Sequence, residues 1–321
     1  MERRAATATC KLGSSSVTAL RIAVGPYRAE SVDDAIRAGG GLPVAADAAA
    51  DGLVWLAPRD TAGLARALEV TGARWIQLSS AGVERTAAAG LLDRSRLWTC
   101  AKGAFAEPVA EHALMLALAG LRMLPERVLA HSWGKPGGVS LYDERVTILG
   151  GGGITASLLD LLAPFRVAAT VVRRSGDPVP GAAHTVPTDR LTDALATAKV
   201  VFVALALTPE TERIIGAAQL DAMRADAWLI NVARGRHVDT GALVAALDNG
   251  SIAGAALDVT EPEPLPDGHP LWKQPRCIIT PHTADTLEMI ERPLARRIQE
   301  NVARFAAGEP LVGAVDPTAG Y

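Results

Sequence analysis

Cysteine and long apolar runs are scarce in this 321-residue sequence, and each scarcity removes a class of protein. Three widely spaced cysteines, Cys10, Cys100 and Cys277, suit neither a disulfide framework nor a metal site. The six histidines include no pair at metal-ligand spacing. No stretch reaches the ~20 apolar residues that cross a bilayer. The net charge of -3 argues against nucleic acid or an anionic membrane as the main partner.

The composition that is present favours a well-packed protein. Hydrophobic residues make up 49% of the chain, which excludes intrinsic disorder because enough apolar surface can be buried. At roughly 100–200 residues per domain, the length predicts about two domains. The N-terminus, Met1-Glu2-Arg3-Arg4 and then Ala, Thr and Ser, lacks the apolar core of a signal peptide. We therefore expect a short disordered tail on a cytoplasmic, metal-free protein.

Short apolar strands alternate with helices along the chain. In the first hundred residues the pattern predicts strands at 21–25, 53–57 and 75–78, with helices at 31–37, capped by Ser31, and 61–69. Later strands are predicted at 146–149, 167–172, 200–204, 228–232, 252–257 and 277–280, with helices at 107–124, 154–162, 209–223, 241–247 and 287–305. Uninterrupted Val/Ile/Ala-rich strands between helices indicate an α/β fold with parallel sheets covered on both faces.

A glycine turn between a strand and a helix is the strongest local signal. The strand at 146–149 runs into four consecutive glycines, and Gly150 and Gly152 fill the first two places of a G-x-G-x-x-G frame. Backbone amides at such a turn, together with the positive end of the next helix, can hold a pyrophosphate. Thr155 occupies the third place, where we expect it to cost packing and not phosphate binding. An ordinary tight turn is the alternative interpretation.

The end of the following strand bears on which dinucleotide binds. An acidic residue there would accept hydrogen bonds from a ribose 2′-hydroxyl, but the sequence has Arg173, Arg174 and Ser175. Arginine pairs well with phosphate. The arrangement therefore predicts a 2′-phosphate site and NADP(H) in preference to NAD(H), unless the two arginines are simply solvated surface residues.

Polar side chains follow three later strands, at the edge where an open parallel sheet binds its ligands. Arg234 follows the strand at 228–232, Asp258 and Glu263 follow the next strand, and His282 follows the last. An imidazole can transfer a proton near neutral pH, and a carboxylate beside it favours the protonated ring. An arginine can clamp a substrate carboxylate and polarise a neighbouring carbonyl. With a reduced nicotinamide, these groups would make a reductase of 2-oxo acids.

Each of these residues also has an ordinary interpretation. Arg234 could serve a salt bridge, His282 could be a buried structural histidine, and Glu261 and Glu263 could lie in an exposed, proline-rich loop. Their joint placement at sheet edges favours the functional interpretation.

The sequence closely resembles the D-isomer-specific 2-hydroxyacid dehydrogenases over nearly the whole chain after the first ~20 residues. The matching segments are Trp75-Ile-Gln-Leu-Ser-Ser-Ala-Gly-Val83, Val109-Ala-Glu-His-Ala113, the glycine turn, Leu207-Thr-Pro-Glu-Thr211, Asn231-Val-Ala-Arg-Gly235, Ala256-Leu-Asp-Val259, Glu263-Pro264 and Thr280-Pro-His282. The resemblance implies two Rossmann-like lobes, with a cofactor lobe at 103–284 inserted into a substrate lobe formed by 1–102 and 285–321. It also implies a homodimer joined through the cofactor lobe, in which the apolar helix at 107–124 is interface instead of core.

The resemblance further assigns roles to single residues. Arg234 would bind and polarise the substrate, His282 would be the acid/base, and Glu263 would be its partner. The substrate carboxylate would also meet backbone amides at Ser80, Ala81 and Gly82. The cofactor would contact Gly150, Gly152, Gly153, Ile154, Arg173, Arg174, Ser175, Leu205, Val232, Asp258 and His282, with Asp258 near the nicotinamide end.

Several positions depart from the family pattern. Thr155 replaces the third glycine, Arg173 stands at the acidic position of NAD-type members, and Ala206 stands where members often have proline. With the chain ending at Tyr321, we expect no extra regulatory domain of the kind found in many phosphoglycerate dehydrogenases, which argues against a serine-pathway enzyme.

The sequence therefore predicts an NADP(H)-preferring, D-stereospecific reductase of small 2-oxo acids such as glyoxylate or hydroxypyruvate, with NAD(H) as a possible cofactor. A non-catalytic module of the same fold that senses dinucleotides is the main alternative. An oxidoreductase for an unusual acid such as phosphite or formate is a third, less favoured interpretation.

Overall fold

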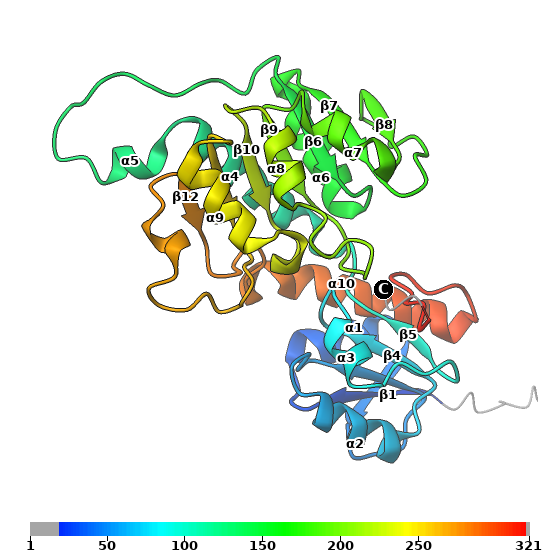
Figure 1. The fold of residues 1–321 in the computed structure, drawn as a ribbon. Helices are drawn as coiled ribbons and strands as arrows, with labels where there is room; N and C mark the ends of the chain where they lie inside the picture. Colours follow the sequence, from blue (N-terminus) through cyan, green and yellow to red (C-terminus); the bar gives the residue numbers. More distant parts are fainter. Residues whose placement is uncertain (1–18, 319–321) are drawn as a thin grey trace, which may run out of the picture.

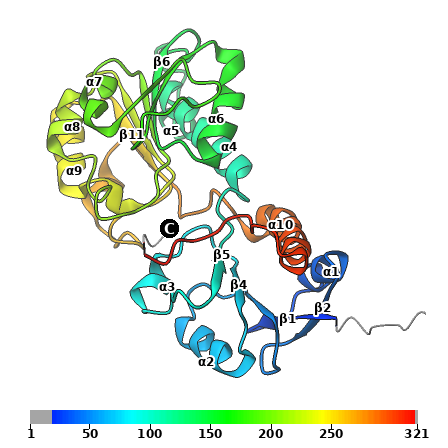
Figure 2. The ribbon, with the colours of Figure 1, turned by 90° about the vertical axis from the view of Figure 1, so that its right-hand side faces the viewer.

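A computed structural model describes residues 19–318, and the predicted N-terminal tail lies outside that range. The chain forms two lobes, each built on a fully parallel sheet (Figures 1 and 2). One sheet has five strands in the order β2-β1-β3-β4-β5, and the other has seven in the order β12-β11-β10-β9-β6-β7-β8. The predicted α/β fold class with two parallel-sheet lobes is confirmed.

The first lobe is formed by both ends of the described chain. Its elements are β1 (Leu20–Gly25), α1 (Glu30–Ala38), β2 (Gly41–Ala45), β3 (Gly52–Trp55), α2 (Thr61–Thr71), β4 (Trp75–Leu78), α3 (Glu84–Ala88), β5 (Leu97–Thr99) and α10 (Leu287–Ala307). Helix α10 returns from the second lobe and packs against α1, as both views show. Residues that follow it extend the lobe through an antiparallel bridge between Thr99 and Ala314.

The second lobe is formed by the middle of the chain. Its helices are α4 (Ala106–Leu121), α5 (Leu124–Val128), α6 (Gly153–Leu162), α7 (Leu191–Leu195), α8 (Ala217–Ala222) and α9 (Thr240–Asn249). Its strands are β6 (Arg145–Leu149), β7 (Ala168–Val172), β8 (His184–Val186), β9 (Val200–Val203), β10 (Trp228–Asn231), β11 (Gly254–Leu257) and β12 (Cys277–Ile279). Short 3₁₀ turns lie at η1 (Ala163–Phe165), η2 (Thr188–Arg190), η3 (Gly235–His237) and η4 (Pro270–Lys273).

The central strands of the second sheet have no polar face. Val200, Val201 and Phe202 of β9 are all fully buried, because α4 and α6 cover one face of the sheet and α8 and α9 cover the other. Burying such a side chain contributes about 1.5–3 kcal/mol. This two-sided burial explains why the strands appear in the sequence as unbroken apolar runs.

Three predicted elements differ in the structure. The helix predicted at 209–223 is reduced to α8, because the Thr211 hydroxyl donates to the carbonyl of Ala206 and accepts from the amide of Thr208, which holds a turn in place of a helix. Ser31 does not cap α1, since the N-cap is Ala29 and no side chain caps the helix. The helix predicted at 107–124 ends earlier, at Leu121, and Met123 beyond it adopts a left-handed conformation.

Among residues 19–318, no helix combines the length and the apolar character that crossing a membrane requires.

Candidate active site

The glycine turn after β6 is shaped to receive a phosphate group. Gly150 has φ +108°, and a Cβ there would collide with the carbonyl oxygen of Ala204, so only glycine fits. A Cβ on Gly152 would meet nothing within 4 Å, because this residue faces open space. Helix α6 starts at Gly153 without a side-chain cap, so its first amides are available to an anion.

This turn borders a cavity of about 330 Å³ between the lobes. The cavity is lined by Gly150, Gly151, Gly152, Gly153 and Ile154 of the turn, by Leu205 and Val232 beyond β9 and β10, and by Ala81 and Gly82 of the first lobe. Glycine backbone, a helix N-terminus and apolar walls together fit a dinucleotide.

Thr155, in the third place of the glycine frame, is fully buried. Its Oγ1 donates a hydrogen bond of 2.7 Å to the carbonyl of Gly150. The side chain therefore ties the first turn of α6 to the glycine turn, which a glycine at this position could not do.

Arg173, Arg174 and Ser175 lie directly after β7, on the same sheet edge as the glycine turn. The Arg173 side chain lies over Gly151, since a Cβ on that glycine would be 3.2 Å from Arg173 Cδ. Arg173 is half-buried, whereas Arg174 and Ser175 are exposed. The Arg173 side chain is thus placed beside the turn that would hold the pyrophosphate.

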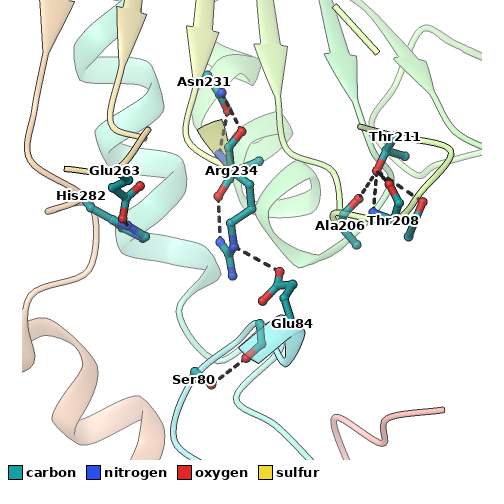
Figure 3. Close-up of polar contacts among 11 residues, drawn as sticks. Ser80, Glu84, Ala206, Thr208, Thr211, Asn231, Arg234, Glu263 and His282 are labelled. Carbon is teal, nitrogen blue, oxygen red and sulfur yellow. Dashed lines mark hydrogen bonds and ion pairs between the residues drawn. The ribbon is translucent and has the colours of Figure 1, made fainter. Parts of the chain in front are cut away.

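Arg234 follows β10 in a loop that Asn231 holds in place. The fully buried Asn231 side chain donates to the carbonyl of Arg234 at 2.9 Å and accepts from the amide of Ala233 at 3.1 Å. Arg234 Nε then donates to Glu84 Oε1 at 3.1 Å, across the cleft in the first lobe, as Figure 3 shows. Glu84 has no place in the sequence prediction, although it follows directly after the Trp75–Val83 segment that resembles the family.

His282 and Glu263 form a close pair on the side of Arg234 that is opposite Glu84 (Figure 3). His282 Nδ1 lies 2.7 Å from Glu263 Oε1, and both side chains are about one-third exposed. Because Nδ1 is engaged by the carboxylate, Nε2 is the ring nitrogen that can exchange a proton with a substrate. His282 also has a left-handed backbone, with φ +52°.

Asp258 is buried under the segment that carries His282. Its carboxylate accepts from Thr280 Oγ1 at 2.6 Å and from the amides of Thr283 and Ala284 at 2.9 and 3.1 Å. Burial raises its pKa, but these bonds and one from His112 outweigh burial and lower the pKa to about 2. The structure thus gives Asp258 a structural task that the sequence analysis did not foresee.

Two further cavities, of about 450 and 520 Å³, meet at Arg234 and His282. Ser80 and Gly82 line both, and the Ser80 hydroxyl donates to the carbonyl of Gly82 at 2.6 Å. Asp285 lines the larger one, and burial raises the pKa of its carboxyl. Within residues 19–318, no group of three His, Cys, Asp or Glu side chains could hold a metal ion.

The geometry can bind an acid and move a proton beside a dinucleotide. A guanidinium able to hold a carboxylate and a histidine–carboxylate pair both line the cavities that meet at the cleft. Arg234 also lines the cavity beside the glycine turn, so the cofactor and the acid would lie next to each other.

Comparisons with known proteins agree with this geometry. The family model described as "D-isomer specific 2-hydroxyacid dehydrogenase, NAD binding domain" matches residues 112–284. An uncharacterized protein from Corynebacterium melassecola is 42% identical over 254 residues, covering 77% of this chain and 84% of the relative.

Solved structures resemble the whole described fold. A D-isomer specific 2-hydroxyacid dehydrogenase from Xanthobacter autotrophicus Py2, solved with NADPH and MES, is 29% identical with a TM-score of 0.80, covering 94% of this chain and all of that one. An NADPH-dependent glyoxylate/hydroxypyruvate reductase from Sinorhizobium meliloti, solved with NADP and sulfate, has a TM-score of 0.79 at 24% identity, covering 94% of this chain and all of that one. At 24% identity, the likeness to the reductase from Sinorhizobium meliloti shows a shared fold alone.

Proposed function

Because the chain belongs to the D-isomer-specific 2-hydroxyacid dehydrogenase family, we propose that it reduces small 2-oxo acids such as glyoxylate or hydroxypyruvate to the D-2-hydroxy acids, with NADPH preferred to NADH. The family consists of nicotinamide-dependent oxidoreductases that act on CH–OH groups. The observation that carries the proposal is the meeting of Arg234 with the His282–Glu263 pair at one cleft.

The residues at the cleft divide the work of the reduction. Arg234 binds the substrate carboxylate and stabilises the negative charge that develops on the keto oxygen. The backbone amides at Ser80, Ala81 and Gly82 bind the same carboxylate from the first lobe. His282, held by Glu263 through Nδ1, donates the proton from Nε2 to the keto oxygen. A reduced nicotinamide, with its dinucleotide held at the glycine turn after β6, would supply the hydride that completes the hydroxy acid.

Substrate binding would compete with an internal anion. In the structure the Glu84 carboxylate already pairs with Arg234 Nε. A 2-oxo acid is chemically equivalent to Glu84 at this position, because both present a carboxylate to the same guanidinium.

Turnover across a panel of acids tests the proposed function directly. With NADPH and glyoxylate, hydroxypyruvate, pyruvate or 2-oxobutanoate, we expect oxidation of NADPH with a D-hydroxy acid as product, and the highest kcat/KM for the smallest acids. Loss of NADPH absorbance and chiral analysis of the product measure both points. Tight NADPH binding with no turnover of any acid would contradict the proposal and favour the dinucleotide-sensing module.

Cofactor choice gives a second prediction. Replacing Arg173 and Arg174 together by alanine should raise KM for NADPH about 10- to 100-fold, because charge-assisted hydrogen bonds to the 2′-phosphate contribute about 1.5–3 kcal/mol. KM for NADH should stay within about twofold, since NADH lacks that phosphate. Arg37→Ala, at an exposed position on α1, is the control. A wild-type preference for NADH would show that the arginine pair has another role.

We also propose that the second lobe carries the contact surface of a homodimer. Helix α5 and the loop after it project from this lobe in Figure 1, and they expose Val128, Leu129 and Trp133, the last at 98% of its surface. Such large exposed apolar groups are typical of an interface. We retain 103–284 as the proposed cofactor lobe, with the remainder of the chain as the substrate lobe.

A further inference from the structure

His112, on α4, contacts a buried cluster that no step of the proposed reaction uses. Its Nε2 lies 3.0 Å from Thr280 Oγ1 and 3.3 Å from Asp258 Oδ1. The His112 side chain is 14% exposed and that of Asp258 1%. His112 does not line any of the three cavities at the cleft, so it is placed to act through other residues.

The hydrogen bonds determine where the proton of this histidine lies. Thr280 Oγ1 has a single proton and donates it to Asp258 Oδ1 at 2.6 Å. The threonine oxygen can therefore only accept from His112, and a carboxylate can only accept. It follows that His112 Nε2 carries a hydrogen and donates to both oxygens.

The cluster fixes the backbone on both sides of His282. On one side, Thr280 is bound to Asp258 through its hydroxyl. On the other side, the amides of Thr283 and Ala284 donate to the same carboxylate, and the His282 amide itself donates to the Asp258 carbonyl at 2.8 Å. Asp258 thus holds the segment through four hydrogen bonds.

A left-handed backbone makes this anchoring necessary. His282 has φ +52°, and a residue with a Cβ adopts that region only when its surroundings enforce it. The segment is also where the chain leaves the second lobe for α10 of the first lobe, as Figure 1 shows. Without its anchors, the turn that presents His282 to Glu263 would lose its fixed position on the second lobe.

We propose that His112 is a positioning residue for His282. By donating from Nε2 to Thr280 and Asp258, it ties α4 to the end of β12 and keeps the His282 ring aligned with Glu263 and with the substrate oxygen. The expected catalytic effect rests on the proposed function, whereas the effect on the backbone does not.

The test compares His112→Ala with His112→Gln, whose side-chain amide restores a donor near the position of Nε2. His112→Ala should lower kcat for a 2-oxo acid about 100-fold, the scale of an active-site group misplaced by about 1 Å, with KM and the Kd of NADPH within about threefold. His112→Gln should recover at least tenfold of that loss. His184→Ala, an exposed histidine on β8, should match the wild type.

Hydrogen exchange supplies a readout that does not depend on turnover. In His112→Ala the amides of Thr283 and Ala284 should exchange faster than in the wild type, and His112→Gln should restore their protection. If the wild type reduces no 2-oxo acid, the proposed function fails, and this exchange pattern still decides the positioning role.

Two results would overturn the proposal. One is a His112→Ala enzyme with wild-type kcat and unchanged exchange. The other is a loss that falls equally on kcat, NADPH binding and global stability and that glutamine does not reverse, which indicates a purely structural histidine. Should His112→Ala fail to fold, Thr280→Val and Thr280→Ser are compared instead. Valine removes the hydroxyl oxygen that accepts from His112, whereas serine retains it. We expect the same pattern of loss in the first variant and recovery in the second.

Discussion

Replacing His282 by alanine should lower kcat/KM for 2-oxo acid reduction by about 10²–10⁴-fold, the range that general acid–base catalysis contributes. The ring is the only imidazole that lines the cavities at the cleft among the described residues, and its Nδ1 is bound to Glu263, so no neighbouring histidine can replace it. The Kd of NADPH should change little. Steady-state kinetics and a fluorescence titration with NADPH separate the two effects.

Glu263→Gln provides the matched comparison for this first result. The amide retains a hydrogen-bonding oxygen near Nδ1 but removes the negative charge beside the ring. We expect a smaller loss than for His282→Ala, because the imidazole itself remains in place. His131→Ala, an exposed residue in the loop beyond α5, should have no effect. A His282→Ala enzyme that keeps more than a tenth of the activity would disprove the assigned proton transfer.

Removal of the Arg234 guanidinium should be comparably severe. Arg234→Ala should lower kcat/KM by about 10²–10³-fold, the magnitude measured when one charge-stabilising donor is removed, and should raise KM for the acid as well. Arg234→Lys should recover only part of the loss, since an ammonium group keeps the charge but cannot form the planar, bidentate pair with a carboxylate. Kinetics with glyoxylate at saturating NADPH measure both parameters.

The Glu84→Gln variant tests whether the ion pair between Glu84 and Arg234 competes with the substrate or holds the arginine in place. The glutamine removes the anion that pairs with Arg234 Nε and thus the internal competitor of the substrate. KM for the acid should therefore stay the same or fall, in contrast to its rise in Arg234→Ala. A rise of KM in Glu84→Gln that matches Arg234→Ala would show that the ion pair holds the arginine in place and does not compete with substrate.

Local pattern was sufficient to locate most of the fold and the residues of the candidate site. The strand at Trp75–Leu78 was predicted with its observed bounds, and α10 and the glycine turn were found because apolar periodicity and turn glycines are encoded within a few residues. Short elements were missed: β2, β5 and β8 have three to five residues each and carry little periodic signal.

The sequence by itself determined the parallel architecture and the side chains that follow its strands, because the carboxyl ends of parallel strands share one edge of a sheet. Beyond the His282–Glu263 pair, which the resemblance implied, it did not determine which side chains meet. Arg234 pairs with Glu84 across 150 residues, and His112 reaches Thr280 across 168. Asp258, which the resemblance places near the nicotinamide end, also accepts hydrogen bonds from the segment that carries His282. Such contacts depend on how two lobes and distant loops pack, and no local pattern encodes that packing.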